Sequence, residues 1–143
     1  ALGKALVIPN GRKVFDIPPP DLDLDYEFAW PLQGTVTQGF HEAHLAVDVG
    51  APYGSSVYAA AAGRVTSAQW ARTGYGFTVI IDHGDGLVSL YSHLKGALVQ
   101  SGTYVERGQI IGEVGSTGNS TGPHVHFEIR LDDQRVNPLN YLK

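Results

Sequence analysis

Apolar and polar residues alternate in short runs along most of this chain, from Trp30 to its end. Glycines bound these runs about every ten residues, and β-branched residues are frequent inside them, which is typical of strands. We expect seven strands, at residues 35–40, 45–49, 63–70, 77–82, 87–94, 109–114 and 124–131. Helical periodicity is not sustained anywhere between the glycine and proline breakers. The pattern therefore predicts an all-β fold with very little helix, built as a strongly curved antiparallel sheet or barrel.

An internal repeat refines this prediction. Gly54-Ser-Ser-Val57 followed by Gly63-Arg-Val65 matches Gly102-Thr-Tyr-Val105 followed by Gly112-Glu-Val114, with one extra residue in the second copy. A repeated strand-turn-strand unit predicts two similar halves wrapped into one sheet. We expect a duplicated fold of the barrel-sandwich hybrid type.

The first 29 residues differ from the rest. Three prolines at 18–20 and an acidic stretch at 21–25 predict a stiff, solvated linker. Residues 2–9 resemble the closing strand of a LysM module, a small glycan-binding domain; an ordinary N-terminal strand is the alternative. We predict an N-terminal extension and linker over residues 1–29 and one compact domain over residues 30–143.

Composition limits the classes of function. With 143 residues, 43% of them hydrophobic and 17% charged, the chain can bury a core. It has no apolar run of the length that spans a membrane. A net charge of -4 leaves no basic stripe for a nucleic-acid partner. The absence of cysteine excludes disulfides and thiolate metal sites, and the absence of methionine predicts a processed or truncated fragment. We expect a monomer, although the sequence does not define the oligomeric state.

The run from His124 to Leu131 carries the most information about chemistry. Its strict alternation places His124, His126, Glu128 and Arg130 on one face and four apolar side chains on the other. The Cα atoms of the two histidines are then about 7 Å apart, so both rings can approach a common centre. A metal or proton-transfer site is one interpretation, and a structural pair is the other.

His44 and Asp48 form a second candidate pair. On a regular strand they share a face, but their Cα atoms lie about 13 Å apart, so a bend or convergent side chains would be needed. A turn residue beside a chance histidine is the alternative. Together with the histidine pair they supply imidazole, carboxylate and imidazole, a set that leaves one position of a catalytic zinc open to water. Zinc brings the pKa of such a water to about 7, which favours a hydrolase.

The remaining polar candidates surround these two elements. His93 ends a strand, on the face that also carries Ser89 and Tyr91, and is a candidate for proton transfer or oxyanion binding. His83, in a hairpin corner, is interpreted as structural. His41 is interpreted as a surface residue. The loop of residues 115–122 lacks the ending of a phosphate-binding loop and is expected to form one wall of a peptide groove.

These residues resemble the lysostaphin-type zinc metallopeptidases, the peptidoglycan endopeptidases also called β-lytic metallopeptidases. The resemblance runs from about Trp30 to Tyr141 and keeps the order of the family's motifs. They are His44-x-x-x-Asp48, Pro52-Tyr-Gly-Ser-Ser-Val-Tyr-Ala59, Tyr91-Ser-His93-Leu94 and Gly115-Ser-Thr-Gly-Asn-Ser-Thr-Gly-Pro-His124-Val-His126-Phe-Glu128.

The resemblance implies a curved sheet with a groove and one zinc ion per chain, bound by His44, Asp48 and His126. It implies that His124 and His93 act on the attacking water and the oxyanion. Asn119 and Tyr91 are expected to bind substrate.

The expected activity is cleavage of peptide cross-links or bridges of bacterial peptidoglycan, outside the cytoplasm. Two alternatives remain: a catalytically silent domain that binds cell wall or activates another hydrolase, and a phosphocarrier-like domain.

Overall fold

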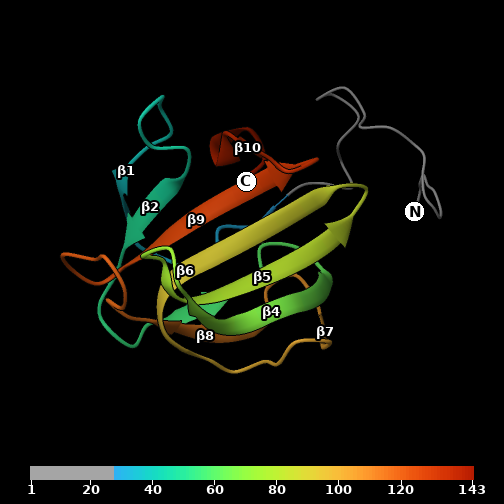
Figure 1. Ribbon diagram of the computed structural model, residues 1–143, viewed down its shortest axis with the longest axis horizontal. Helices are drawn as coiled ribbons and strands as arrows, with labels where there is room; N and C mark the ends of the chain where they lie inside the picture. The colour runs from blue at the N-terminus through green and yellow to red at the C-terminus, as the bar shows by residue number, and fades with distance from the viewer. Residues whose placement is uncertain (1–27) are drawn as a thin grey trace.

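The computed structural model describes residues 28–143, which form a ten-stranded, almost wholly antiparallel sheet (Figure 1). The predicted linker and LysM-like stretch lie outside the described residues, apart from Phe28 and Ala29. The strands are β1 (Thr35–Gln38), β2 (Val47–Gly50), β3 (Ser56–Tyr58), β4 (Gly63–Ala71), β5 (Gly76–Gly84), β6 (Leu87–Ala97), β7 (Tyr104–Val105), β8 (Ile110–Val114), β9 (His124–Leu131) and β10 (Gln134–Val136).

All seven predicted strands are present, and the all-β prediction is confirmed. The prediction omitted β3, β7 and β10, each of two or three residues, which are too short to show alternation. In the described part of the chain, helix is confined to one 3-10 turn, Pro138–Asn140. No helix there is long and apolar enough to cross a membrane.

The sequence repeat corresponds to two interlocked units. The first strand of each unit pairs with the second strand of the other, β3 with β8 and β4 with β7. Even the register is equivalent, because Val57 lies across from Gly112 and Val105 lies across from Gly63. At both glycines a Cβ atom would come within 2.4 to 2.7 Å of a backbone oxygen, which explains why the repeat keeps glycine there. The predicted duplication is therefore present in the fold.

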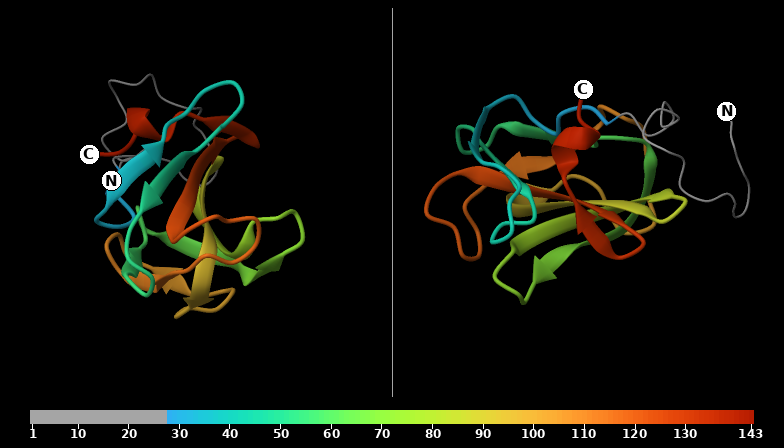
Figure 2. Two further views of the ribbon diagram at one scale, coloured as in Figure 1. Left: turned by 90° about the vertical axis from the view of Figure 1, so that its left-hand side faces the viewer. Right: turned by 90° about the horizontal axis from the view of Figure 1, so that it is seen from above.

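The sheet curves around one hydrophobic core without closing into a barrel within residues 28–143. The main path runs β1-β2-β9-β6-β5-β4-β7, with β10 beside β9 and with β8 bridging β6 and β3. The curvature is visible in both views of Figure 2. The apolar face of β9 lies at the centre of the core, where Val125, Phe127 and Ile129 are fully buried. Phe28 belongs to the same core and forms a bridge with Leu142.

Strand β6 changes partner at His93. Residues 87–92 pair with β9, and residues 94–97 pair with β8. The register with β5 shifts at the same place, so that β6 carries one extra residue, a β-bulge. His93 has φ of 64°, in the left-handed region that non-glycine residues rarely adopt. The bulge bends the sheet beside the polar face of β9.

Candidate metal centre

The three predicted metal ligands meet on the polar face of β2 and β9. Asp48 lies directly across from His126 in the antiparallel register. His44 precedes β2, and a turn at residues 41–44 followed by a bend at Ala46 brings it back over the strand. One potential ligand atom from each of the three lies within 4.8 Å of the other two. This bend resolves the 13 Å separation that a straight strand would impose.

The donor atoms suit a tetrahedral ion. Two ligands about 2.0–2.1 Å from such an ion lie about 3.3 Å apart. Nε2 of His44 is 3.2 Å from Oδ2 of Asp48, and Nδ1 of His126 is 3.1 Å from Oδ1. Nδ1 of His44 donates to the carbonyl oxygen of Gly39 at 2.9 Å, which leaves a lone pair on Nε2. That Nε2 is buried and has no hydrogen-bond partner among the described residues, as expected of a metal ligand.

His126 lies between two carboxylates. Its Nδ1 faces Asp48, and its Nε2 is 2.9 Å from Oε2 of Glu128. Burial alone lowers the pKa of His126, but the hydrogen bonds to Asp48 and Glu128 outweigh it and raise the pKa to about 9. Burial raises the pKa of Asp48, yet its bond to His126 leaves that pKa below the ordinary value. Without metal the ring is therefore a cation near neutral pH, and a cation bound at Nδ1 replaces a proton.

Glu128 orients the His126 ring through a hydrogen bond to its Nε2. Its side chain is fully buried and accepts bonds from Nε2 of His126, from the Tyr75 hydroxyl, and from Nε and Nη2 of Arg130 at 2.8 and 2.7 Å. Burial raises the pKa of Glu128, but these donors outweigh it and lower the pKa to about 2. The Tyr75 ring also packs on the His126 ring, with centroids 5.2 Å apart. Sequence reasoning missed both partners, because Tyr75 lies in a loop and Glu128 was recognised only as a member of the polar face.

His93 reaches the site because of the bulge. By simple alternation it shares a face with Ser89 and Tyr91, and that part of the prediction is wrong. The positive φ turns the side chain to the opposite face, where its ring centroid lies 4.8 Å from that of His124. Its backbone N–H donates to Tyr75, and its Nδ1 lies 2.6 Å from the Thr117 carbonyl oxygen. Burial lowers the pKa of His93, so the ring is neutral and presents a lone pair on Nε2.

His124 is oriented in the same way. Its Nδ1 donates to the carbonyl oxygen of Gly122 at 2.9 Å, with the Ser120 hydroxyl 3.2 Å away. Its Nε2 lies 3.9 Å from Oδ2 of Asp48. Both histidines thus have Nδ1 held by a backbone carbonyl, and their rings lie beside the candidate ligand His126 or its partner Asp48.

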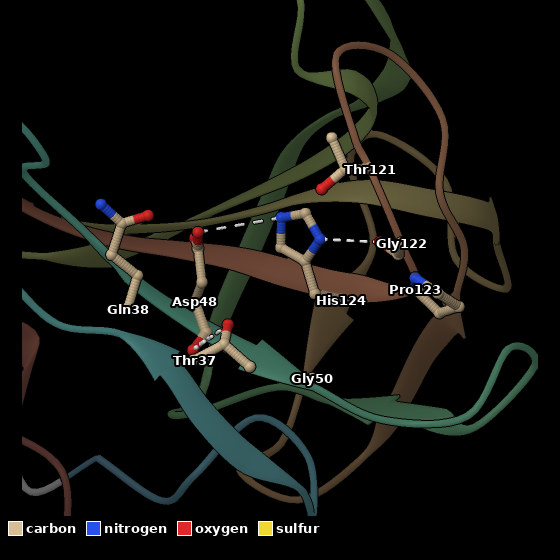
Figure 3. Close-up of a pocket in the computed structure, with 8 residues that line it drawn as sticks. All are labelled: Thr37, Gln38, Asp48, Gly50, Thr121, Gly122, Pro123 and His124. Atoms are coloured by element: carbon tan, nitrogen blue, oxygen red, sulfur yellow. Dashed lines mark hydrogen bonds and ion pairs between the residues drawn. The ribbon is translucent and has the colours of Figure 1, made fainter.

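A groove opens beside these residues (Figure 3). It has a volume of about 340 Å³. Asp48 and His124 point into it from β2 and β9, and the loop before His124 forms its rim. Its lining residues are Thr37, Gln38, Asp48, Gly50, Thr121, Gly122, Pro123 and His124. From the loop of residues 115–122, Thr121 and Gly122 line this groove; its contact with a peptide stays a prediction.

Comparison with known proteins identifies the family. The model of peptidase family M23 matches residues 42–138. This range contains the five polar residues described above, namely His44, Asp48, His93, His124 and His126. The chain belongs to peptidase family M23. This result agrees with the lysostaphin-type resemblance of its motifs.

Three M23 relatives illustrate the range of the match. DD-carboxypeptidase/endopeptidase Mpg of Neisseria meningitidis serogroup B is 45% identical over 97 residues, which are 68% of this chain and 22% of Mpg. Murein hydrolase activator EnvC of Escherichia coli K12 is 40% identical over 119 residues, 79% of this chain and 28% of EnvC. The crystal structure of a zinc containing peptidase from Vibrio cholerae is 31% identical with a TM-score of 0.72, covering 78% of this chain and 39% of that one. The chain spans less than a third of the two curated relatives.

One predicted substrate contact is wrong. Tyr91 is fully buried, and its hydroxyl accepts from the Ala60 N–H and bonds to Ser89. Burial raises its pKa to about 12. This tyrosine belongs to the core of the M23 domain, because β6 turns Tyr91 toward Phe127. Asn119 is exposed on the predicted loop, where its backbone N–H donates to Gly74; its contact with substrate stays a prediction.

The other two histidines do not join the M23 site. His41 is exposed, and its ring contacts Gln38 and the Ala43 N–H. His83 forms hydrogen bonds of 2.7 Å with the Ala62 carbonyl oxygen and with the Ser89 hydroxyl. Its pKa is lowered by burial, in keeping with a structural role.

Proposed function

We propose that this M23 domain is a zinc-dependent endopeptidase that hydrolyses peptide cross-links or bridges of bacterial peptidoglycan. The observation that carries the proposal is the buried Nε2 of His44, which makes no hydrogen bond in the described chain, lies 3.2 Å from Oδ2 of Asp48, and converges with Asp48 and His126. Three protein ligands of this kind form the open donor set of a catalytic zinc rather than a closed structural one. When bound, zinc would act as a Lewis acid and make hydroxide available near neutral pH.

His124 and His93 would perform the proton chemistry. A general base must offer a lone pair toward the proton that it removes, and Nε2 of His124 does so 3.9 Å from Asp48. His124 would accept the proton of the attacking water and then donate it to the leaving amine nitrogen. His93 would take up one proton from solvent at Nε2 and donate it in a hydrogen bond to the developing oxyanion, whose negative charge offsets the lowered pKa of the ring; the proton would return to solvent when the oxyanion collapses. The bonds from both Nδ1 atoms to backbone carbonyls fix the ring orientations in advance.

The relatives support the choice of substrate. One is named a DD-carboxypeptidase/endopeptidase and another a murein hydrolase activator, and both names concern the cell wall. The groove beside Asp48 and His124 is open along one side, which suits an extended peptide. A wall substrate places the domain outside the cytoplasm.

Activation of another hydrolase is the alternative, and the 40% identity to EnvC favours it. An activator needs a binding surface but no metal chemistry. The complete set of three ligand side chains and two oriented histidines in this chain favours hydrolysis.

Digestion of purified sacculi separates the two functions. The zinc-loaded chain should release muropeptides whose masses show a hydrolysed peptide bond. His126→Ala should abolish that release, because two protein ligands hold zinc poorly, whereas Arg64→Ala, at an exposed position of β4 outside the groove, serves as a control that retains it. If the folded, zinc-loaded chain releases nothing alone but stimulates a second wall hydrolase, the enzyme proposal is wrong.

A further inference from the structure

A second hollow is separate from the groove of Figure 3 and shares none of its lining residues. It is lined by Thr73, Tyr75, Arg130, Asp133 and Arg135, and its volume is about 460 Å³. Its lining residue Tyr75 packs on the ring of His126, a candidate metal ligand, with centroids 5.2 Å apart. We call it the arginine cleft.

The two arginines of this cleft are cross-strand neighbours. Arg135 in β10 lies directly across from Arg130 in β9, so both side chains are on the polar face, and like charges in this position destabilise a sheet. Buried Glu128 balances one of them, because it accepts two bonds from Arg130. Arg135 is 3.8 Å from the same carboxylate, too far for a hydrogen bond, and is 41% exposed. Arg135 thus forms a long ion pair with Glu128 but no hydrogen bond that the structure shows among the described residues, so its guanidinium donors can bind an additional anion.

Asp133 lines the same cleft without neutralising Arg135. It occupies the turn between β9 and β10, where Asp132 and Asp133 have φ of 51° and 68°. Among the described residues, no ion pair joins Asp133 to either arginine. Because Asp133 lines the cleft, its negative charge would oppose an incoming anion.

We propose that the arginine cleft binds a free carboxylate of the substrate peptide, with Arg135 as the principal donor. The inference rests on the proposed function and names a specificity determinant for it. His126 and Arg130 are four positions apart along β9, about 13 Å, and both arginine side chains reach back toward Glu128. At about 3.3 Å per residue, the carboxylate lies two to four residues of extended peptide from the bond that is cut. A planar guanidinium suits this ligand because it can bind a carboxylate through two parallel bonds.

The test uses paired peptides taken from the muropeptide that the chain releases from sacculi. One peptide carries a carboxylate and the other a carboxamide at the same residue, and kcat/KM is measured for both. The native chain should prefer the carboxylate. Arg135→Gln should lower the ratio of the two kcat/KM values by about tenfold, through KM, because a charged hydrogen bond is lost. Arg72→Gln, which removes the same charge from an exposed residue outside the cleft, is the control and should leave the ratio unchanged.

Asp133→Asn tests the sign of the effect. Asparagine tolerates the left-handed turn, and loss of the competing charge should raise the preference for the carboxylate peptide. An Arg135→Gln variant that hydrolyses both peptides with the native ratio overturns the carboxylate site while leaving the proposed function intact. Absence of hydrolysis of either peptide by the native, zinc-loaded chain overturns the proposed function, and the carboxylate site falls with it.

Discussion

Replacement of Glu128 by glutamine tests the support beneath His126. The substitution keeps the size of the side chain but removes its charge and points an amide NH2 group at the donors of Arg130 or Tyr75. Because Glu128 is fully buried, water cannot replace the lost acceptor. We expect the variant to lose both stability and zinc affinity, by separable amounts.

The loss of stability follows from the pKa of Glu128. That pKa falls from 4.5 to about 2 on folding, and at 1.36 kcal/mol per unit this corresponds to about 3 kcal/mol. Because the folded pKa is depressed, the contribution is present above about pH 4.5 and is lost as the pH falls toward 2. The Glu128→Gln variant should therefore be about 3 kcal/mol less stable than the native chain at neutral pH, and the difference should vanish in acid.

The loss of zinc affinity has two opposing components. Loss of a carboxylate that orients a histidine ligand typically weakens metal binding about 10- to 100-fold. Glu128 also helps to raise the pKa of His126 to about 9, so its removal relieves proton competition near neutral pH. Near pH 9 this second effect is small, and the full weakening should appear; at pH 7 part of it should be masked.

The assay pairs chelator competition for zinc at pH 7 and pH 9 with urea denaturation of the metal-free chain. Glu113→Gln is the matched control, because Glu113 is half-exposed beside Lys95 and should change neither quantity by much. If Glu128→Gln lowers stability but binds zinc with native affinity at pH 9, Glu128 is only a structural residue and the reasoning fails.

Three further predictions follow from the same geometry. His124→Ala and His93→Ala should keep zinc and lose about 10²- to 10⁴-fold in turnover, whereas His126→Ala should lose the metal. Metal analysis and kinetics on the same samples check this. Loss of zinc in His124→Ala with zinc retained in His126→Ala would contradict the assignment. Zinc binding below pH 9 should release the proton of His126, so the apparent Kd for zinc should fall about tenfold for each unit by which the pH rises toward 9. Calorimetry in buffers of different ionisation enthalpy measures this proton release. Zinc binding without proton release at pH 7.5 would refute the raised pKa of His126. Gly118→Ala should cost more stability than Gly54→Ala, because both have positive φ but only at Gly118 would a Cβ meet backbone atoms, at 2.4 Å; equal shifts in thermal unfolding would contradict this.

The predictable part of the fold has strong local signals. The alternation of β9 placed His124 and His126 on one face, and the pairing of β2 with β9 explains why Asp48 meets them. The repeat around Gly63 and Gly112 predicted the duplication because both glycines meet backbone. Such features depend on periodicity and on local steric demands, which a sequence displays directly.

The remaining features depend on tertiary context. Alternation placed His93 with Tyr91, and a single bulged residue with positive φ reversed the face. Nothing local to Tyr75 marks it as a partner of Glu128, because they are 53 residues apart and meet only when β5, β6 and β9 are assembled. A bulge and a long-range hydrogen bond produce no periodic pattern in the sequence. The face on which His93 lies and the hydrogen bonds of Glu128 to His126 and Tyr75 could therefore not be predicted from the sequence alone.

The most direct test of the account is a zinc titration of the metal-free chain, with bound metal and release of muropeptides from sacculi measured on the same samples. Hydrolysis should rise with bound zinc and reach its plateau at one ion per chain. Folded chain that binds one zinc without hydrolysing the wall, or that hydrolyses it fully without zinc, would contradict it.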